Sequence, residues 1–323
     1  MEQASQLLFT AGTIVLAVAF AAYVGHAVLL ANGRRSLGLA ASAATAAGVA
    51  LLGAPRPAWA GVATGSFVTS RAAEAARGPA DFAAPSPLSR VSTWLGVGAF
   101  ALLLASMLVR AYLVGRGPWG NLYEFSEAFA TSILGTYLLL GRRYPIKAIG
   151  FIPLGIALGM ALYASSLPSN IKPLVPALAN APLLTIHVGM AMLAYGIFAT
   201  SFAAGVGYLI QGREDRFAWL PSHKVLDQVA YRAVIIGFPI FATMIILGSW
   251  WASIAWSAYW SWDPKETAAL VTWLSYAIYL HARNQRAWAG RPAALLLVVA
   301  FLMVLVTYSG SLWFNGLHAY SGL

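Results

Sequence analysis

The chain has 323 residues, of which 60% are hydrophobic and only 9% are charged, and its mean hydropathy is +0.72. A water-soluble domain carries about 25% charged residues, so this composition excludes that class and indicates an integral membrane protein. The net charge of +10 is then better interpreted as topological charge on membrane loops than as a nucleic-acid-binding surface. The sequence contains no cysteine, which excludes disulfides, thiol relays and thiolate metal ligands.

Long apolar runs predict eight membrane-spanning helices. The first run is too long for a signal-peptide core and lacks a basic leader, so we expect it to be retained as a membrane helix. The predicted fold class is therefore an all-α, polytopic membrane helical bundle. In chain order the spans lie at about 7–31, 92–114, 122–141, 146–164, 183–210, 231–251, 265–283 and 292–313.

Segment 37–53 is a possible ninth span. It is rich in Ala and Gly and poor in Leu and aromatic residues, so its insertion into a membrane would be marginal. A full crossing there would put Arg34 and Arg35 outside or break the later charge pattern, so we predict a cytoplasmic-side or re-entrant segment. Residues 54–90 are typical of a loop. We divide the chain into an N-terminal region, 1–91, and a transmembrane domain, 92–323.

Basic residues collect in alternate connections between the predicted spans. Under the eight-span prediction these clusters share one side, which the positive-inside rule makes cytoplasmic. They are Arg34, Arg35, Arg90, Arg142, Arg143, Lys147, Arg213, Arg216, Lys224, Arg232, Arg283, Arg286 and Arg291. The opposite, outer side holds Arg110, Arg116, Lys172 and Lys265.

A tryptophan-rich segment lies between the sixth and seventh predicted spans, on the outer side. Residues 250–262 contain Tyr259 and the five tryptophans Trp250, Trp251, Trp256, Trp260 and Trp262. An aromatic belt at the membrane interface accounts for one or two tryptophans at a helix end, but not readily for this density. The segment therefore predicts a platform for a large planar ligand.

The tryptophans are followed by Asp263, Pro264, Lys265 and Glu266. Asp at the N-cap, Pro at the first helical position and Glu three residues after the cap predict a helix start. Such a cap is compatible with a functional role, because it fixes the direction of the aromatic segment that precedes it.

Two histidines flank the tryptophan-rich segment in sequence. His187 is at the outer start of the fifth span, and His318 follows the last span, also outside. A lone interfacial histidine is usually only a polar helix-end residue. Two of them beside a flat aromatic surface fit axial ligation of haem iron by two imidazoles.

The remaining histidines allow more than one interpretation. His281 lies near the cytoplasmic end of its span, where a functional role and a snorkelling helix-end residue are both consistent with the spacing. His26 has a similar depth, and on depth alone we hypothesise that His26 and His281 share a second, inner haem site. His223, in a polar loop, is expected to be a solvated surface residue.

A second outer motif is PWGNLYEFSEAF, residues 118–129. Asn121 and Glu124 are typical of a cap and its partner at a helix start. Glu124 and Glu127 share a helix face and could alternatively contact haem edge groups or a partner. Carboxylates would repel haem propionates, so Arg116, Lys172 and Lys265 are better candidates for binding them.

The run from Gly237 to Arg283, with Trp-Ser-Trp-Asp-Pro-Lys-Glu-Thr at 260–267, resembles the tryptophan-rich "WWD" region of the haem-handling protein family. It is most similar to the CcsA/ResC branch of cytochrome c biogenesis system II, and NLYEF at 121–125 and LDQVAYR at 226–232 also resemble signatures of that branch. The resemblance covers about 92–323. Two residues depart from the pattern. Position 257 is Ser where the family often has Gly, and position 268 is Ala where the family commonly has Trp.

The resemblance implies haem b as a substrate in transit. His187 and His318 match the two external iron ligands, and His281 matches the transmembrane histidine. Further haem contacts are expected from the WWD segment, residues 250–267, through Trp251, Trp256, Trp260, Trp262 and Asp263, and from His26 if the inner site exists.

The implied function is delivery of haem across the plasma membrane and its presentation, outside, to apocytochrome c for thioether attachment at Cys-x-x-Cys-His. The implied activity is holocytochrome c synthase, in complex with a CcsB/ResB-type membrane protein. Because this chain has no cysteine, a separate thiol-reducing protein is also expected. The alternatives are a haem exporter without synthase activity and an assembly subunit without haem.

Overall fold

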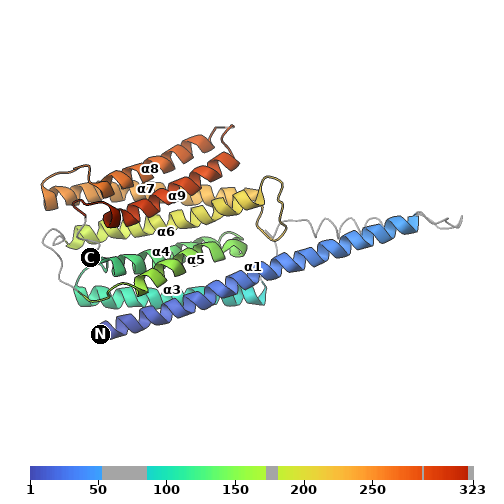
Figure 1. Ribbon diagram of the computed structural model, residues 1–323, viewed down its shortest axis with the longest axis horizontal. Helices are drawn as coiled ribbons and strands as arrows, with labels where there is room; N and C mark the ends of the chain where they lie inside the picture. Colours follow the sequence, from blue (N-terminus) through green and yellow to red (C-terminus); the bar gives the residue numbers. More distant parts are fainter. Residues whose placement is uncertain (53–85, 172–180, 286, 319–323) are drawn as a thin grey trace.

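The computed structural model describes residues 1–52, 86–171, 181–285 and 287–318 (Figure 1). Within them the chain forms eight α-helices, one short 3-10 helix and no strand, so the all-α prediction is confirmed. The elements are α1 (Glu2–Leu52), α3 (Pro87–Val114), α4 (Leu122–Gly141), η2 (Lys147–Ile149), α5 (Phe151–Ser165), α6 (Ala181–Gln211), α7 (His223–Trp256), α8 (Pro264–Arg283) and α9 (Arg291–Trp313).

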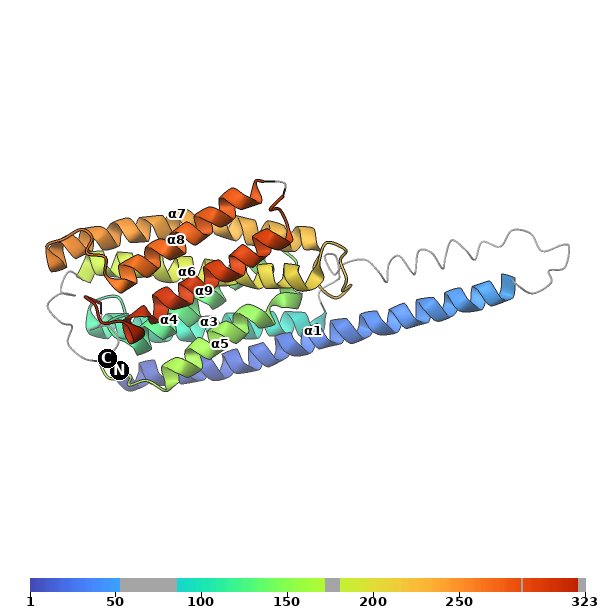
Figure 2. The ribbon, with the colours of Figure 1, turned by 45° about the horizontal axis from the view of Figure 1, so that its top comes forward.

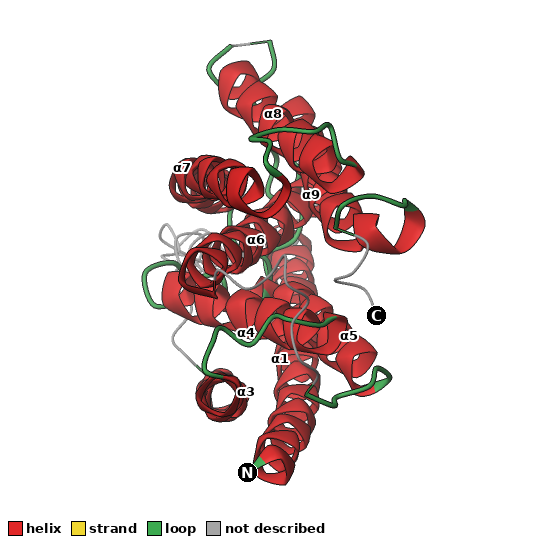
Figure 3. Ribbon diagram, turned by 90° about the vertical axis from the view of Figure 1, so that its left-hand side faces the viewer, coloured by secondary structure: helices red, strands yellow, loops and turns green. Residues whose placement is uncertain are grey.

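The helices form one bundle with α4 and α6 near its centre (Figures 2 and 3). Helix α6 packs against α4, α7 and α9, whereas α1 packs against α3 and α5. Six helices are long and apolar enough to cross a membrane. The other two, α4 and α8, do not meet that measure of length and hydropathy, but each has 20 residues and therefore rises about 30 Å, the thickness of a hydrocarbon core. The chain is a multi-pass membrane protein.

Segment 37–52 continues α1 without a break. The helix extends well beyond the rest of the bundle (Figure 2), so this part of the chain is neither a separate crossing nor a re-entrant segment. Residue 53 and most of the expected loop at 54–90 lie outside the described residues. The division at residue 92 stays a prediction, although α3 already begins at Pro87.

The two ends of the bundle differ in charge. The N-terminus and the C-terminal end of α9 lie at the same end as the tryptophan-rich segment, as eight crossings require (Figure 2). The connections α4–α5, α6–α7 and α8–α9 lie at the other end (Figure 2). The first two carry Arg142, Arg143, Arg213 and Arg216. The basic connections that the sequence predicted on one side therefore lie at one end of the folded bundle.

The tryptophan-rich segment is divided between a helix and a turn. We expected it to connect two helices, but α7 continues to Trp256, so Trp250, Trp251 and Trp256 lie on its last turns. Trp260 and Trp262 belong to the connection before α8. The helix ends at Ser257, whose φ of 59° is left-handed. This conformation explains why a Gly at this position suits the fold.

Replacing Ser257 by Gly is expected to stabilise the protein by about 1 kcal/mol, because Gly adopts a left-handed backbone without the Cβ clash of Ser. Ser257 is exposed, so little packing is lost. The measurement is thermal unfolding in detergent. Ala255→Gly, inside α7, is the matched control and should lower the unfolding temperature. A Ser257→Gly protein no more stable than wild type would contradict the prediction.

Candidate functional site

A cavity opens at the tryptophan-rich end of the bundle, between the start of α4, α6, the end of α7, the start of α8 and the C-terminal turn. Most of its wall is apolar and aromatic. Its lining includes Trp119, Asn121, Phe125, His187, Tyr195, Met244, Gly248, Trp251, Trp256, Trp260, Lys265, Glu266 and His318. The two outer histidines, distant in sequence, therefore line one cavity.

His187 is held by the backbone of α7. Its Nδ1–H donates to the carbonyl of Met244, with 2.9 Å between the nitrogen and the oxygen. The approach is close because Gly248, one turn later, has no side chain: a Cβ there would lie 2.5 Å from Cε1 of His187. A carbonyl only accepts, so Nδ1 must carry the proton and the lone pair of the neutral ring lies on Nε2.

His318 is held by the aspartate that caps α8. Its Nδ1–H donates to Oδ1 of Asp263 at 2.7 Å, and the backbone N–H of Leu317 donates to Oδ2 at 2.6 Å. Asp263 also accepts from the N–H of Lys265 and forms the predicted capping box with Glu266. The residue that begins α8 therefore also fixes the C-terminal turn.

The charge of Asp263 is well stabilised. Burial alone would raise its pKa, but the hydrogen bond and charge of His318, together with the N–H groups of Lys265 and Leu317, lower the pKa to about 2. The carboxylate therefore stays ionised and keeps the proton of His318 on Nδ1. Both histidines thus present Nε2 as the basic nitrogen, the arrangement that metal-binding histidines normally have.

Three of the predicted tryptophans line the cavity and two do not. Trp251 and Trp256 lie edge to face, with ring centroids 4.7 Å apart, and Trp256 is 4.8 Å from the ring of His318. Trp260 completes this wall. In contrast, Trp250 is 56% and Trp262 69% exposed, and neither lines the cavity. The interface-belt interpretation fits these two, and Trp262 is not placed where we expected it.

One of the proposed propionate-binding cations lies in the cavity wall. Lys265 lines it, with Nζ 5.0 Å from the centre of the Phe125 ring. Arg116 is outside the lining and is engaged by Glu124, whose Oε2 is 3.2 Å from its Nη1. Lys172 lies outside the described residues.

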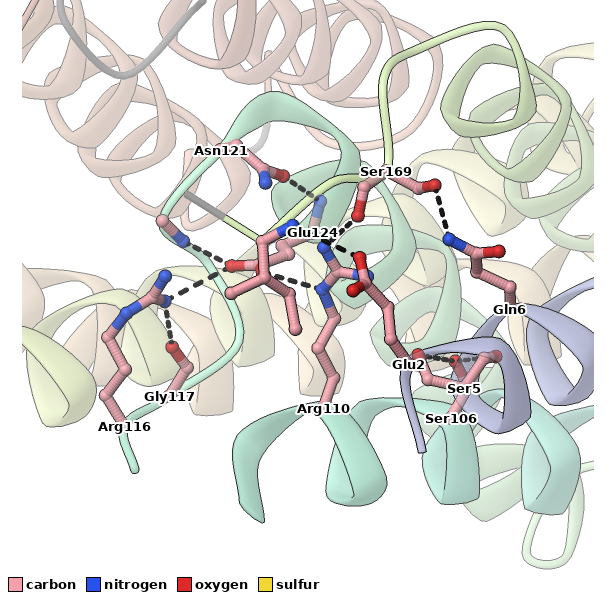
Figure 4. Close-up of polar contacts among 12 residues, drawn as sticks. Glu2, Ser5, Gln6, Ser106, Arg110, Arg116, Gly117, Asn121, Glu124 and Ser169 are labelled. Carbon is pink, nitrogen blue, oxygen red and sulfur yellow. Dashed lines mark hydrogen bonds and ion pairs between the residues drawn. The ribbon is translucent and has the colours of Figure 1, made fainter. Parts of the chain in front are cut away.

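A buried ionic network supports the turn that precedes α4 (Figure 4). Glu124 accepts from Nε of Arg110 at 2.7 Å and from the N–H of Gly120 at 2.6 Å, and Arg110 also donates to the carbonyl of Ser169. Both charged side chains of the Arg110–Glu124 pair are fully buried. Asn121 caps α4 as predicted, by accepting from the N–H of Glu124.

Glu124 is therefore structural rather than exposed, and Glu127 is buried as well. Both are buried and neither lines the cavity, so contact of these carboxylates with haem edge groups or an outside partner does not fit the structure. Instead, Glu124 fixes the turn that carries Trp119 into the cavity.

Several cavity residues were not predicted from the sequence. Trp119 and Phe125 belong to the PWGNLYEF motif, which was recognised only as a helix start and a family signature. Tyr195 and Met244 are apolar-face residues of long helices, without any local signal. Gly248 lies two residues before Trp250, the first of the five tryptophans, and its position is the one available hint of a close approach.

The structure does not bring His26 and His281 together. His26 is buried between α1 and the start of α3, with Nδ1 3.3 Å from the hydroxyl of Ser86. His281 is exposed at the end of α8, against Gln285. Helices α1 and α8 lie on opposite sides of the bundle (Figure 3). The similar depth of His26 and His281 in the membrane did not bring the two side chains together, and a shared inner haem site is not supported. His223 is also more enclosed than expected, because it pairs with Asp215.

Comparison with known proteins agrees with this geometry. The family described as cytochrome C assembly protein matches residues 119–318, a region that begins at Trp119 and ends at His318, both in the cavity wall. The chain therefore belongs to the cytochrome c assembly protein family.

Within that family the chain is of the CcsA type. It is similar to the cytochrome c biogenesis protein CcsA of Synechococcus sp. (strain CC9902), with 34% identity over 252 residues, covering 68% of this chain and 83% of the relative. The CcsA of Microcystis aeruginosa is 30% identical over 287 residues, covering 70% and 87%. The CcsA of Chlamydomonas reinhardtii is 36% identical over 232 residues, covering 68% and 65%. The chain functions in cytochrome c biogenesis, a role that implies handling of haem and an apocytochrome c substrate.

Proposed function

We propose that this protein holds haem b in the outer cavity, with the iron between His187 and His318, and presents it to apocytochrome c. One observation carries the proposal: two imidazoles from distant parts of the chain line one aromatic cavity, and each has its Nδ1 proton fixed by a neighbouring acceptor. Two imidazoles and a flat apolar wall suit a haem iron and its macrocycle.

The attachment chemistry belongs to the haem and the substrate. Each cysteine thiol of a Cys-x-x-Cys-His sequence adds across a haem vinyl group: sulfur bonds to one vinyl carbon and hydrogen to the other, without net oxidation or reduction. The histidine of the sequence replaces one axial ligand. The role of this chain is to position the haem and limit access to it.

The reaction requires partners. A chain without cysteine cannot reduce the substrate's disulfide through a thiol of its own, so a separate thiol-reducing protein supplies the free thiols. A CcsB/ResB-type membrane protein completes the synthase. Haem approaches from the cytoplasmic side near His281, which is open at the surface of α8. By the positive-inside rule, the cavity faces outward across the plasma membrane.

The proposal is tested by co-expression of the chain and its partner with an apocytochrome c in a host that lacks its own maturation proteins. We expect haem that stays on the cytochrome after denaturing electrophoresis, and none on a substrate whose two cysteines are serines. Export of haem without covalent attachment would favour the exporter alternative instead.

Asp263→Asn is expected to weaken haem binding by about 10- to 100-fold, because the imidazole of His318 loses the carboxylate that orients it and raises its basicity. Asn is a good N-cap, so α8 should still form. The measurement is titration of the purified protein with haem. Asp227→Asn, which alters the pair with Arg283 at the other end of the bundle, is the control. Unchanged affinity in Asp263→Asn would contradict the assigned role.

A further inference from the structure

A second cavity lies at the other end of the bundle, where the end of α6 meets the start of α9. Its volume is about 430 Å³, within the usual range of small-molecule sites. Its lining residues are Tyr208, Leu209, Gly212, Arg213, Glu214, Arg216, Ala287, Arg291 and Pro292. None of these nine residues lines the outer cavity, so the proposed function makes no use of this second cavity.

The charge of the second cavity is positive. Its described lining carries three guanidinium groups and one carboxylate, that of Glu214. Arg213 is anchored, because its Nη2 donates to the carbonyl of Ala289 at 2.7 Å. Arg216 and Arg291 are exposed, and no acidic side chain of the described residues forms an ion pair with either. Two of the three guanidinium groups are therefore available to an anion from outside the chain.

The start of α9 adds a further positive element to the cavity. Gly290 precedes the helix with a φ of 92°, and no side chain among the described residues caps it. A Cβ at Gly290 would lie 2.8 Å from the hydroxyl of Tyr208 and 2.9 Å from Nη2 of Arg213. Polar groups from both sides of the cavity therefore meet at the start of α9, whose helix dipole also favours an anion there.

An exposed apolar stripe runs along α9 from the second cavity. Leu295, Val299, Leu302 and Val306 are between 41% and 50% exposed. They follow Arg291 at intervals of three or four residues, so the five side chains share one face of the helix. In a membrane this face meets hydrocarbon. The surface therefore suits an occupant with a negative charge at Arg291 and an apolar tail along the stripe.

We propose that the second cavity binds the phosphodiester of an anionic phospholipid, whose acyl chains lie along α9. Guanidinium groups suit phosphate, because their paired N–H donors match its oxygens. The cavity lies at the end of the bundle that carries the basic connections, which the positive-inside rule places beside the anionic lipids of the cytoplasmic leaflet. Such a lipid bridges Arg216, after α6, and Arg291, at the start of α9, and stabilises the packing of these two helices.

The test is thermal unfolding of the purified, delipidated chain in a neutral detergent. The chain is titrated with phosphatidylglycerol or with phosphatidylcholine that has the same acyl chains. Phosphatidylglycerol should protect wild type at a concentration at least about tenfold lower than phosphatidylcholine requires. In Arg216→Gln/Arg291→Gln, the phosphatidylglycerol concentration that gives half of the protection should rise by at least about tenfold.

Arg142→Gln/Arg143→Gln is the matched control, because it removes the same charge from the same end of the bundle and neither residue lines the cavity. This control should keep the wild-type preference for phosphatidylglycerol. An equal loss in the control would overturn the proposal, since general surface charge would then explain the response. Equal protection of wild type by the two lipids would also overturn it. Equal protection by inorganic phosphate would overturn the assignment to a lipid.

Discussion

Replacement of both His187 and His318 by Ala is expected to abolish covalent attachment of haem to co-expressed apocytochrome c, to below about 1% of the wild-type yield. Each imidazole supplies one axial bond, and without either the iron has no protein ligand in the outer cavity. The measurement is the haem stain of the cytochrome after denaturing electrophoresis, normalised to the amount of this protein in the membrane.

His223→Ala is the control for the loss of a histidine, because His223 pairs with Asp215 at the other end of the bundle. Its attachment yield should equal that of wild type. The attachment yields of His187→Ala and His318→Ala should lie between those of the double variant and wild type, because one axial ligand remains in each single variant. A double variant that still matures the cytochrome would show that the outer histidines do not hold the haem that is attached.

Replacement of Arg110 by Met is expected to destabilise the protein by about 3–5 kcal/mol, the cost of leaving a buried carboxylate without its main cation. Glu124 is fully buried, and Arg116 and the N–H of Gly120 cannot replace the 2.7 Å contact with Arg110. The same change should loosen the turn that carries Trp119. The measurement is thermal unfolding in detergent, combined with haem affinity.

A double variant, Arg110→Met with Glu124→Leu, separates ionic from packing effects. Replacement of a whole buried pair by apolar side chains is often close to neutral, so the double variant should recover much of the lost stability. Its haem affinity should stay low, because the turn before α4 loses its anchor. An Arg110→Met protein within 1 kcal/mol of wild type would show that the network is not structural.

The helices themselves were predictable because their signals are local. Apolar runs long enough to cross a membrane predicted the spans. Asp263 and Glu266 predicted the capping box that begins α8. The end of α7 was placed too early, because interfacial aromatic residues do not stop a helix. What stops it is the left-handed Ser257, a conformation that sequence alone rarely reveals in a non-Gly residue.

The site was only half predictable, because tertiary contacts determine the rest. His187 and His318 could be proposed from their position beside the tryptophans, but the acceptor of His187 is a backbone carbonyl, which has no sequence signal. Depth in the membrane gave no information on lateral position, so His26 and His281 were wrongly paired. The turn that carries Trp119 into the cavity is anchored in part by Arg110, a distant residue on α3, through Glu124.

The central claim is that two imidazoles hold haem iron in the outer cavity, and the most direct measurement is the visible absorption spectrum of the purified protein. It should be recorded oxidised and reduced, after addition of haem and with the partner present. We expect the sharp spectrum of a six-coordinate, bis-histidine haem, which is lost or shifted in the His187→Ala/His318→Ala variant. A colourless wild type would contradict haem handling, and an unchanged spectrum in the variant would place the haem at another site.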